Sequence, residues 1–201
     1  AFTNYISDPK EWCALFKVPG KDDSGIWRVV FPTDPEQTEE YIFSDSAIES
    51  RLQGFHPKKD PFNVIHRNLY VVHQRVASRY RDGRVLLAGD AAHVNNPLGG
   101  MGLNFGFHDV INLTNKLGKI LLNGADEGLL DLYDRQRRTV AEEYLQRQSI
   151  ENKRNMENKD DKSREAFHRE LKAIVSDPAK VHQYLRRAAM LEGIERERSI
   201  T

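Results

Sequence analysis

The stretch from Gly83 to Phe107, GRVLLAGDAAHVNNPLGGMGLNFGF, constrains the fold more than any other part of the sequence. It opens with a short apolar run, Val85 to Ala88, which is punctuated by glycine before and after and is typical of a strand buried on both faces. Asp90 follows where that strand is expected to end. Ligands of open α/β sheets collect outside the carboxyl ends of the strands, so the pattern predicts that Asp90 accepts hydrogen bonds from a sugar-like polyol.

The second half of the stretch carries three glycines within four residues, Gly99, Gly100 and Gly102, just before Leu103 and Asn104 open an expected helix. Without Cβ atoms the backbone N–H groups can approach a planar or anionic ligand, and the helix start adds partial positive charge at the same place. The spacing is not the GxGxxG dinucleotide fingerprint, because its last glycine is missing, and no Lys-Ser or Lys-Thr follows as in a Walker loop. The glycines therefore predict a backbone cradle of another kind.

These residues, GRVLLAGDAAH followed by NNPLGGMGLNFGFHDVINL, resemble the second FAD-binding motif of the class A flavoprotein aromatic hydroxylases, whose type member is p-hydroxybenzoate hydroxylase. The resemblance implies that Asp90 binds the ribityl chain of FAD and that the Pro97 loop packs beside the isoalloxazine. It also implies that the backbone from Gly100 to Asn104, with Gly99 before it, meets the pyrimidine edge of the flavin. The implied reaction uses NAD(P)H to reduce FAD, and one oxygen atom of O₂ is then transferred to a small aromatic substrate.

The same resemblance implies an α+β chain that forms part of an α/β, Rossmann-like FAD-binding fold of the p-hydroxybenzoate hydroxylase type. Residues 1–80 are expected to belong to a substrate-binding antiparallel sheet, residues 81–125 to carry the second FAD motif with its strand and helix, and residues 126–201 to form C-terminal helices. The family opens with a strand, a GxGxxG turn and a helix that hold adenosine and pyrophosphate, and this sequence has no such stretch. We therefore expect the C-terminal portion of a longer enzyme, which alone binds FAD weakly and is inactive.

Local patterns predict several elements in the first half of the chain. Alternation over residues 12–18 and an apolar run over residues 26–31 predict a hairpin. Ser44 is expected to cap a short helix that ends before Gly54, with Glu49 within reach of a capping interaction. The segment 62–76 is rich in Val, Ile and Tyr and is expected to be extended, with its clearest strand at residues 70–76.

The second half of the sequence predicts helices. Residues 103–122 have apolar residues at helical spacing, beginning with Phe107, Val110 and Ile111, and this helix is expected to pack on the sheet and to stop near Gly124. A second helix is expected from Glu127, a third through Phe167 and a fourth from Ser176-Asp177-Pro178. The charged segment 151–172 suits an exposed helix or a connection of little order. The tail is expected to pack on the body, or on a second subunit of a homo-oligomer, and to carry no chemistry.

Residues that suggest other chemistry have simpler interpretations. His93 follows Asp90 by three positions, but no serine or cysteine nucleophile accompanies it, so we interpret it as a structural histidine of the loop. His93, His108, Asp90 and Asp109 lack a zinc-binding spacing such as HExxH, and we predict no metal site. Cys13, the only cysteine, is expected to be a small core residue. No residue of the chain is assigned a catalytic part.

Composition limits the partners. Lys and Arg together number 30 and are balanced by 30 Asp and Glu, so we expect no nucleic acid as a partner. Neither a membrane span nor a signal peptide is visible, and we expect a cytoplasmic protein. Two alternatives stay open: a nucleotide- or phosphate-binding module built on the glycine loop, and a helical protein-interaction module built on residues 127–201. The first should place a Lys or Arg near the glycines, whereas the nearest downstream Lys is Lys116, and the second should expose an apolar stripe.

Overall fold

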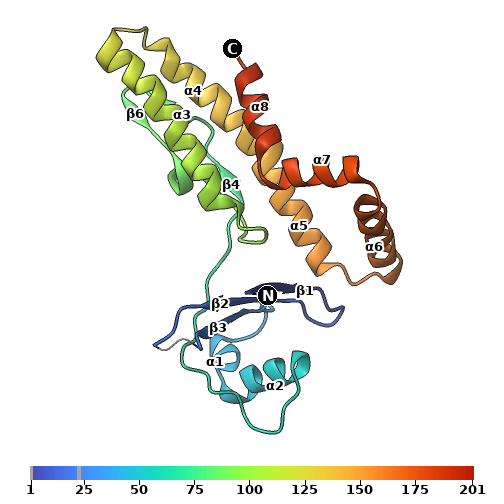
Figure 1. The fold of residues 1–201 in the computed structure, drawn as a ribbon. Helices are drawn as coiled ribbons and strands as arrows, with labels where there is room; N and C mark the ends of the chain where they lie inside the picture. The colour runs from blue at the N-terminus through green and yellow to red at the C-terminus, as the bar shows by residue number, and fades with distance from the viewer. Residues whose placement is uncertain (1, 22–23) are drawn as a thin grey trace. The chain divides into compact units, whose positions relative to one another are not determined.

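The computed structural model of the protein describes residues 2–21 and 24–201. The chain is divided into two compact units, residues 1–71 and residues 72–201. The fold is α+β: a small antiparallel sheet with two helices forms the first unit, and the second unit is mainly helical (Figure 1). The functional division expected at residues 80 and 125 stays a prediction.

The sheet of the first unit has the order β1-β2-β3, and both pairs are antiparallel. Its strands are Thr3–Ile6 (β1), Cys13–Val18 (β2) and Ile26–Val30 (β3). The predicted hairpin of β2 and β3 is confirmed, whereas β1 was not foreseen because its four residues are too few to show an alternation. Cys13 is buried, as expected of a small core residue.

Two helices follow the sheet, α1 (Glu39–Ile42) and α2 (Asp45–Phe55). The Ser44 side chain accepts a hydrogen bond from the Ala47 N–H at 3.2 Å, which confirms the predicted cap. Gly54 lies inside α2, so its prediction as the helix stop is wrong. The Glu49 carboxylate accepts hydrogen bonds from the Gln53 side chain and the Phe62 N–H, so this residue links α2 to the following loop and does not cap the helix.

The segment 62–76 is mostly irregular, and the strand predicted for residues 70–76 is reduced to β4 (Arg75–Val76). Its apolar residues find no sheet among the described residues to pack on: Ile65 is 64% exposed and Val71 is 78% exposed. A strand needs a hydrogen-bonded neighbour, and only the last two residues have one. A β-type composition alone was therefore misleading here.

The second unit begins with short strands and turns around the motif. These are β4, β5 (Arg81–Asp82), β6 (Val85–Leu86), the single-turn 3₁₀-helix η1 (Gly89–Ala91) and β7 (His93–Val94). β4 pairs with β7 and β5 pairs with β6, all antiparallel. The prediction of a strand buried on both faces at residues 85–88 is wrong for the described chain: β6 has two residues, one neighbour, and a Val85 that is 65% exposed.

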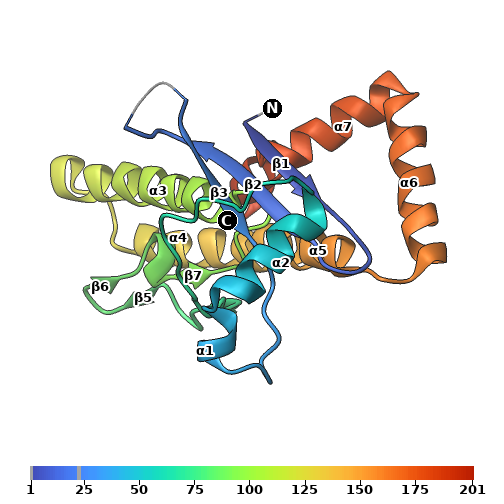
Figure 2. The same ribbon diagram turned by 90° about the horizontal axis from the view of Figure 1, so that it is seen from below.

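Helices complete the second unit. They are α3 (Met101–Asn123), α4 (Gly128–Val140), the π-helix η2 (Ala141–Gln146), α5 (Arg147–Glu157), α6 (Asp161–Val175), α7 (Pro178–Ala188) and α8 (Leu191–Ser199). α3 and α4 lie side by side, α4 continues through η2 into α5, and α6 and α7 meet at a steep angle (Figures 1 and 2). Asp177 caps α7 and Gly124 ends α3 in the left-handed conformation, which confirms both predictions.

The side of α3 that is buried differs from the prediction. Met101, Phe105, Asp109 and Asn112 are buried against η1, α4 and η2. The apolar residues expected to pack on a sheet are instead exposed, for example Phe107 at 57% and Ile111 at 58%. The sequence suggested an apolar contact face, but within the described chain α3 is held by a face that includes a carboxylate and an amide.

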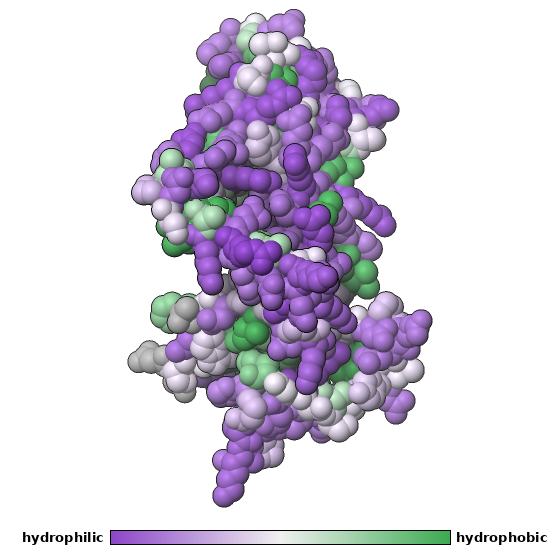
Figure 3. All heavy atoms as spheres, turned by 90° about the vertical axis from the view of Figure 1, so that its right-hand side faces the viewer, coloured by the Kyte–Doolittle hydropathy of each residue, from purple (hydrophilic) through white to green (hydrophobic). Residues whose placement is uncertain are grey.

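The described residues contain no helix with the length and apolar character that crossing a bilayer requires. The face of the molecule seen in Figure 3 is mainly hydrophilic, and its hydrophobic residues form scattered groups. This face shows none of the continuous apolar stripe that a helical interaction module requires.

Candidate functional site

Asp90 lies in η1, a tight turn that is seated directly on α3. Gly89 opens the turn with a φ of 60°, and a Cβ added at Gly106 of α3 would lie 3.2 Å from the Gly89 Cα. Two glycines therefore allow the backbones of η1 and α3 to touch. The Asp90 side chain is exposed, so its carboxylate is available to a ligand beside α3.

The N-terminus of α3 forms the second part of the site. Gly100 is its N-cap residue with a φ of 64°, and the helix start has no side-chain cap hydrogen bond. A Cβ at Gly100 would meet nothing within 4 Å, so the backbone faces open space there. The positive end of the helix dipole and the unbonded N–H groups of the first turn thus lie at a helix start that is open to space at Gly100.

The other two glycines of the loop have neighbouring side chains close by. A Cβ at Gly99, where φ is 95°, would lie 2.5 Å from Asn152 Nδ2, and a Cβ at Gly102 would lie 2.9 Å from Asn95 Oδ1. Their lack of a side chain therefore has a reason within the chain itself. Of the three glycines, Gly100 is the one at which the space beyond the backbone is open.

Most of the predicted site residues are exposed, and whether they form one binding site stays a prediction. Asp90, Pro97, Gly99, Gly100, Leu103 and Asn104 are exposed, and Gly102 is half-buried in the first turn of α3. Gly100 donates its N–H to the Pro97 carbonyl at 3.0 Å, and the Asn104 side chain donates to the Gly100 carbonyl at 2.9 Å. These bonds fix the loop onto the helix start.

A buried carboxylate, Asp109 of α3, holds this surface from behind. Its Oδ2 accepts hydrogen bonds from the Gly89 N–H at 2.9 Å and from His93 Nε2 at 2.7 Å, and its Oδ1 accepts from Arg137 Nε at 2.7 Å. Burial would raise the pKa of Asp109, but the hydrogen bond from His93 and the charge of Arg137 outweigh it and hold the pKa below its ordinary value. Asp109 is thus an ionised anchor for the turn that presents Asp90.

Arg137 connects this anchor to the C-terminal helix. Its side chain is fully buried on α4, and its Nη1 lies 2.6 Å from Glu197 Oε2 on α8. α8 also packs closely on α4, because a Cβ added at Gly193 of α8 would lie 3.2 Å from a methyl group of Val140. The expectation that the tail packs on the body is confirmed.

Sequence reasoning missed Asp109 and Arg137 as parts of the site. His93 was interpreted as a structural residue, and it is buried and bonded to Asp109. Arg137 stands in a run with Arg135 and Arg138, and nothing in the run marks which of the three turns inward. Asp109 was weighed only as a metal ligand. The described residues contain no group of three His, Cys, Asp or Glu side chains that could hold a metal ion.

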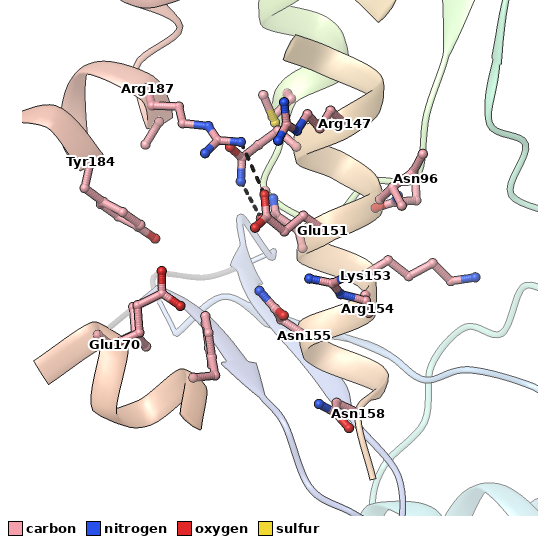
Figure 4. A pocket seen from close by; sticks show the side chains of 18 of the residues that line it. Asn96, Arg147, Glu151, Lys153, Arg154, Asn155, Asn158, Glu170, Tyr184 and Arg187 are labelled. Carbon is pink, nitrogen blue, oxygen red and sulfur yellow. Dashed lines mark hydrogen bonds and ion pairs between the residues drawn. The ribbon is translucent and has the colours of Figure 1, made fainter. Parts of the chain in front are cut away.

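A polar hollow lies behind the Pro97 loop, among α5, α6 and α7 (Figure 4). It is open to solvent and has a volume of about 2020 Å³. Side chains of both charges line it, and Arg187 and Glu151 form an ion pair across it at 3.2 Å. Asn96 and Gly99 of the loop are among the residues that line it.

Comparison with known proteins identifies the family. The model of the FAD binding domain family matches residues 4–148. The chain belongs to this family. It is 34% identical to the para-nitrophenol 4-monooxygenase of Pseudomonas sp. strain WBC-3 over 197 residues, which cover 94% of this chain and 47% of that protein.

Solved structures of flavoprotein hydroxylases agree with this assignment. The p-nitrophenol 4-monooxygenase PnpA of Pseudomonas putida DLL-E4 matches with a TM-score of 0.69 and 32% identity, covering 94% of this chain and 42% of PnpA. Aklavinone-11 hydroxylase in complex with FAD and aklavinone matches with a TM-score of 0.62 and 28% identity, covering 73% of this chain and 27% of that one. The chain is thus a class A flavoprotein hydroxylase sequence and spans about half the length, or less, of the relatives it matches.

The residues of the exposed surface fit FAD, the cofactor of this family. An accessible carboxylate at Asp90 suits ribityl hydroxyls, and the start of α3 offers N–H donors and positive partial charge to the electron-rich edge of a flavin. The open space at Gly100 leaves room for a planar ring against the backbone. The family membership favours this ligand over the phosphate- or nucleotide-binding module and over the helical interaction module.

Proposed function

We propose that the protein, at its natural length, is an FAD-dependent monooxygenase that hydroxylates a small aromatic substrate with NAD(P)H and O₂. The family match and the names of the relatives support this activity. The observation that carries it is geometric: the exposed Asp90 turn is seated on the same helix whose uncapped N-terminus faces open space at Gly100. A location in the cytoplasm and assembly into a homo-oligomer stay predictions of the sequence.

Each part of the surface has a role in this proposal. The Asp90 carboxylate accepts hydrogen bonds from the ribityl chain, and the Pro97 loop packs beside the ring system. The backbone from Gly99 to Asn104 donates to the pyrimidine edge, where negative charge develops when the flavin is reduced. When bound, FAD would supply the redox chemistry, in which NAD(P)H provides two electrons, one oxygen atom of O₂ enters the aromatic ring and the other leaves as water.

The test replaces the carboxylate that binds the ribityl chain. In the protein at its natural length, Asp90→Ala should weaken FAD binding by roughly tenfold to a hundredfold, because a charge-assisted hydrogen bond contributes about 1.5–3 kcal/mol. The FAD dissociation constant is measured by the quenching of flavin fluorescence when FAD is added to the apoprotein. Asp82→Ala, at another exposed aspartate of the same unit, should leave it unchanged. An unaltered dissociation constant in folded Asp90→Ala removes Asp90 from the site.

A further inference from the structure

The Pro97 loop is held in place by a network of side-chain amides and one hydroxyl that lies on the side of the loop away from the motif surface. The network consists of Gln74, Asn96, Gln146 and Ser149, and Asn152 extends it. Its members come from the segment before β4, from the loop, from η2 and from α5. Asn96 and Ser149 are buried, so these contacts are shielded from water.

Gln74 is the centre of this network. Its Oε1 accepts hydrogen bonds from both the backbone N–H and the side-chain amide of Asn96, each at 3.0 Å. Its Nε2 donates to Gln146 Oε1 at 2.6 Å and to Ser149 Oγ at 2.7 Å. One amide group thus joins the loop to η2 and α5 through four hydrogen bonds, which uses its donor and acceptor capacity fully.

The loop receives three more bonds that fix its path toward the glycines. Asn96 Nδ2 donates to the Ser149 carbonyl at 2.8 Å, and Asn96 Oδ1 accepts the Leu98 N–H at 3.1 Å. Asn152 Nδ2 donates to the Leu98 carbonyl at 3.2 Å. The backbone on both sides of Pro97 is therefore tied to α5, and Asn152 occupies the space that a side chain at Gly99 would need.

The π-helix η2 keeps α5 in the rotation that these bonds require. The buried positions of α4, η2 and α5 include Arg137, Ala141, Leu145 and Ser149, which lie four residues apart. An α-helix completes a turn in about 3.6 residues, so over these twelve residues an unbroken α-helix would rotate Ser149 by about 120° relative to Arg137. The wider π-turn takes up one residue, about 100° of that rotation, and Ser149 bonds to Gln74 while Arg137 bonds to Asp109.

We infer that Gln74, with Ser149 and Asn152, is a positioning residue for the flavin ring: it sets the path of the Pro97 loop against the N-terminus of α3. This inference rests on the proposed function. A loop without these bonds would still connect β7 to α3, but its backbone would no longer be fixed beside the ring. The effect should therefore be seen in the flavin itself rather than only in the stability of the protein.

The experiment uses the natural-length protein loaded with FAD and replaces Gln74 by methionine, which has a similar shape and no amide. Gln74→Met should weaken FAD binding by about tenfold, the equivalent of one net hydrogen bond, and should change the visible circular dichroism spectrum of the bound oxidised flavin. Ser149→Ala, which keeps a good helix former in α5, should change the FAD affinity and the circular dichroism spectrum in the same direction, but by less. Gln183→Met, at an exposed glutamine of α7, should change neither.

Two results would overturn the inference. One is a folded Gln74→Met protein with wild-type FAD affinity and a wild-type flavin spectrum. The other is a loss of thermal stability in both variants while the flavin spectrum stays unchanged, which would make the network merely structural. If Gln74→Met does not fold, Ser149→Ala decides in the same way. A parallel Asp90→Ala measurement separates the two proposals: weak FAD binding there with no effect at Gln74 or Ser149 leaves the function standing and removes the positioning role.

Discussion

The motif surface and the polar layer behind it differ in how they are built. On the surface, Asp90, Gly100 and Leu103 are exposed, and their neighbours are mainly adjacent backbone atoms. In the layer behind, Asp109, His93 and Arg137 are buried and bonded to partners 16 to 60 positions away in the sequence. The surface residues are thus free to bind a ligand, while the residues that position them also hold the fold together.

The largest expected effect on stability is at Asp109. Asp109→Ala leaves Arg137 buried with one of its two carboxylate partners gone, and it leaves the Gly89 N–H and His93 without their acceptor. Removing one partner of a buried ion pair costs about 3–5 kcal/mol, so the free energy of unfolding should fall by that order. Urea unfolding followed by far-ultraviolet circular dichroism measures it. A loss below about 1 kcal/mol would mean that the layer behind the motif does not hold the fold.

A smaller loss should appear when Asp109 is protonated rather than removed, because the neutral carboxyl keeps part of its hydrogen bonding. The folded state lowers the pKa of this group. Its ionised form therefore stabilises the fold above the ordinary Asp pKa of about 4, and this contribution is lost as the pH falls through the lower, folded-state pKa. Asp109→Asn should remove this part of the pH dependence. The free energies of unfolding of wild type and Asp109→Asn should differ at pH 6 and should become more similar as the pH falls. A constant difference at all pH values would contradict the assignment.

The contact between η1 and α3 can be tested with two glycines of the same helix. A Cβ at Gly118 meets nothing within 4 Å, so Gly118→Ala should raise the free energy of unfolding by about 0.5–1 kcal/mol through helix propensity. Gly106→Ala gains the same propensity but must push Gly89 away, and it should be less stable than Gly118→Ala by about 1 kcal/mol or more. FAD affinity should fall in Gly106→Ala alone. Equal stabilisation by both changes would show that η1 can move away from α3 without lowering the free energy of unfolding.

Sequence reasoning succeeded where the signal is local. The Ser44 and Asp177 caps, the glycine after α3 and the hairpin of β2 and β3 each depend on neighbouring residues, and each is present. The residues of the motif surface were chosen on the same kind of local signal, since Asp90 and the glycines lie within one short stretch, and their binding of FAD stays a prediction. Strand predictions at residues 70–76 and 85–88 were wrong because a strand depends on partners that its own composition does not specify.

The positioning residues were missed for a related physical reason. Gln74 bonds to residues 72 and 75 positions away, and only the packing of α5 on the loop brings them together. The sequence places Arg137 between two other arginines, and its side chain points inward because its partners Asp109 and Glu197 lie there. The rotation of Ser149 depends on one π-turn that no residue type marks. Amphipathic patterns identify which side of a helix is apolar. The residues that position the motif surface lie on sides of α3, α4 and α5 that carry polar residues, so these patterns do not reveal them.

The smallest expected effect on stability is at Asp90, and it sharpens the contrast between surface and layer. Asp90 is exposed and, within residues 2–21 and 24–201, has no hydrogen bond or ion pair that holds another element, so Asp90→Ala should change the free energy of unfolding of the apoprotein by no more than about 0.5 kcal/mol. The same substitution should have the largest effect on FAD affinity. Measuring urea unfolding and FAD titration on one set, Asp90→Ala, Asp109→Ala and wild type, separates the two roles. If Asp90→Ala destabilises the apoprotein as much as Asp109→Ala does, Asp90 belongs to the structural layer and the division between the two regions fails.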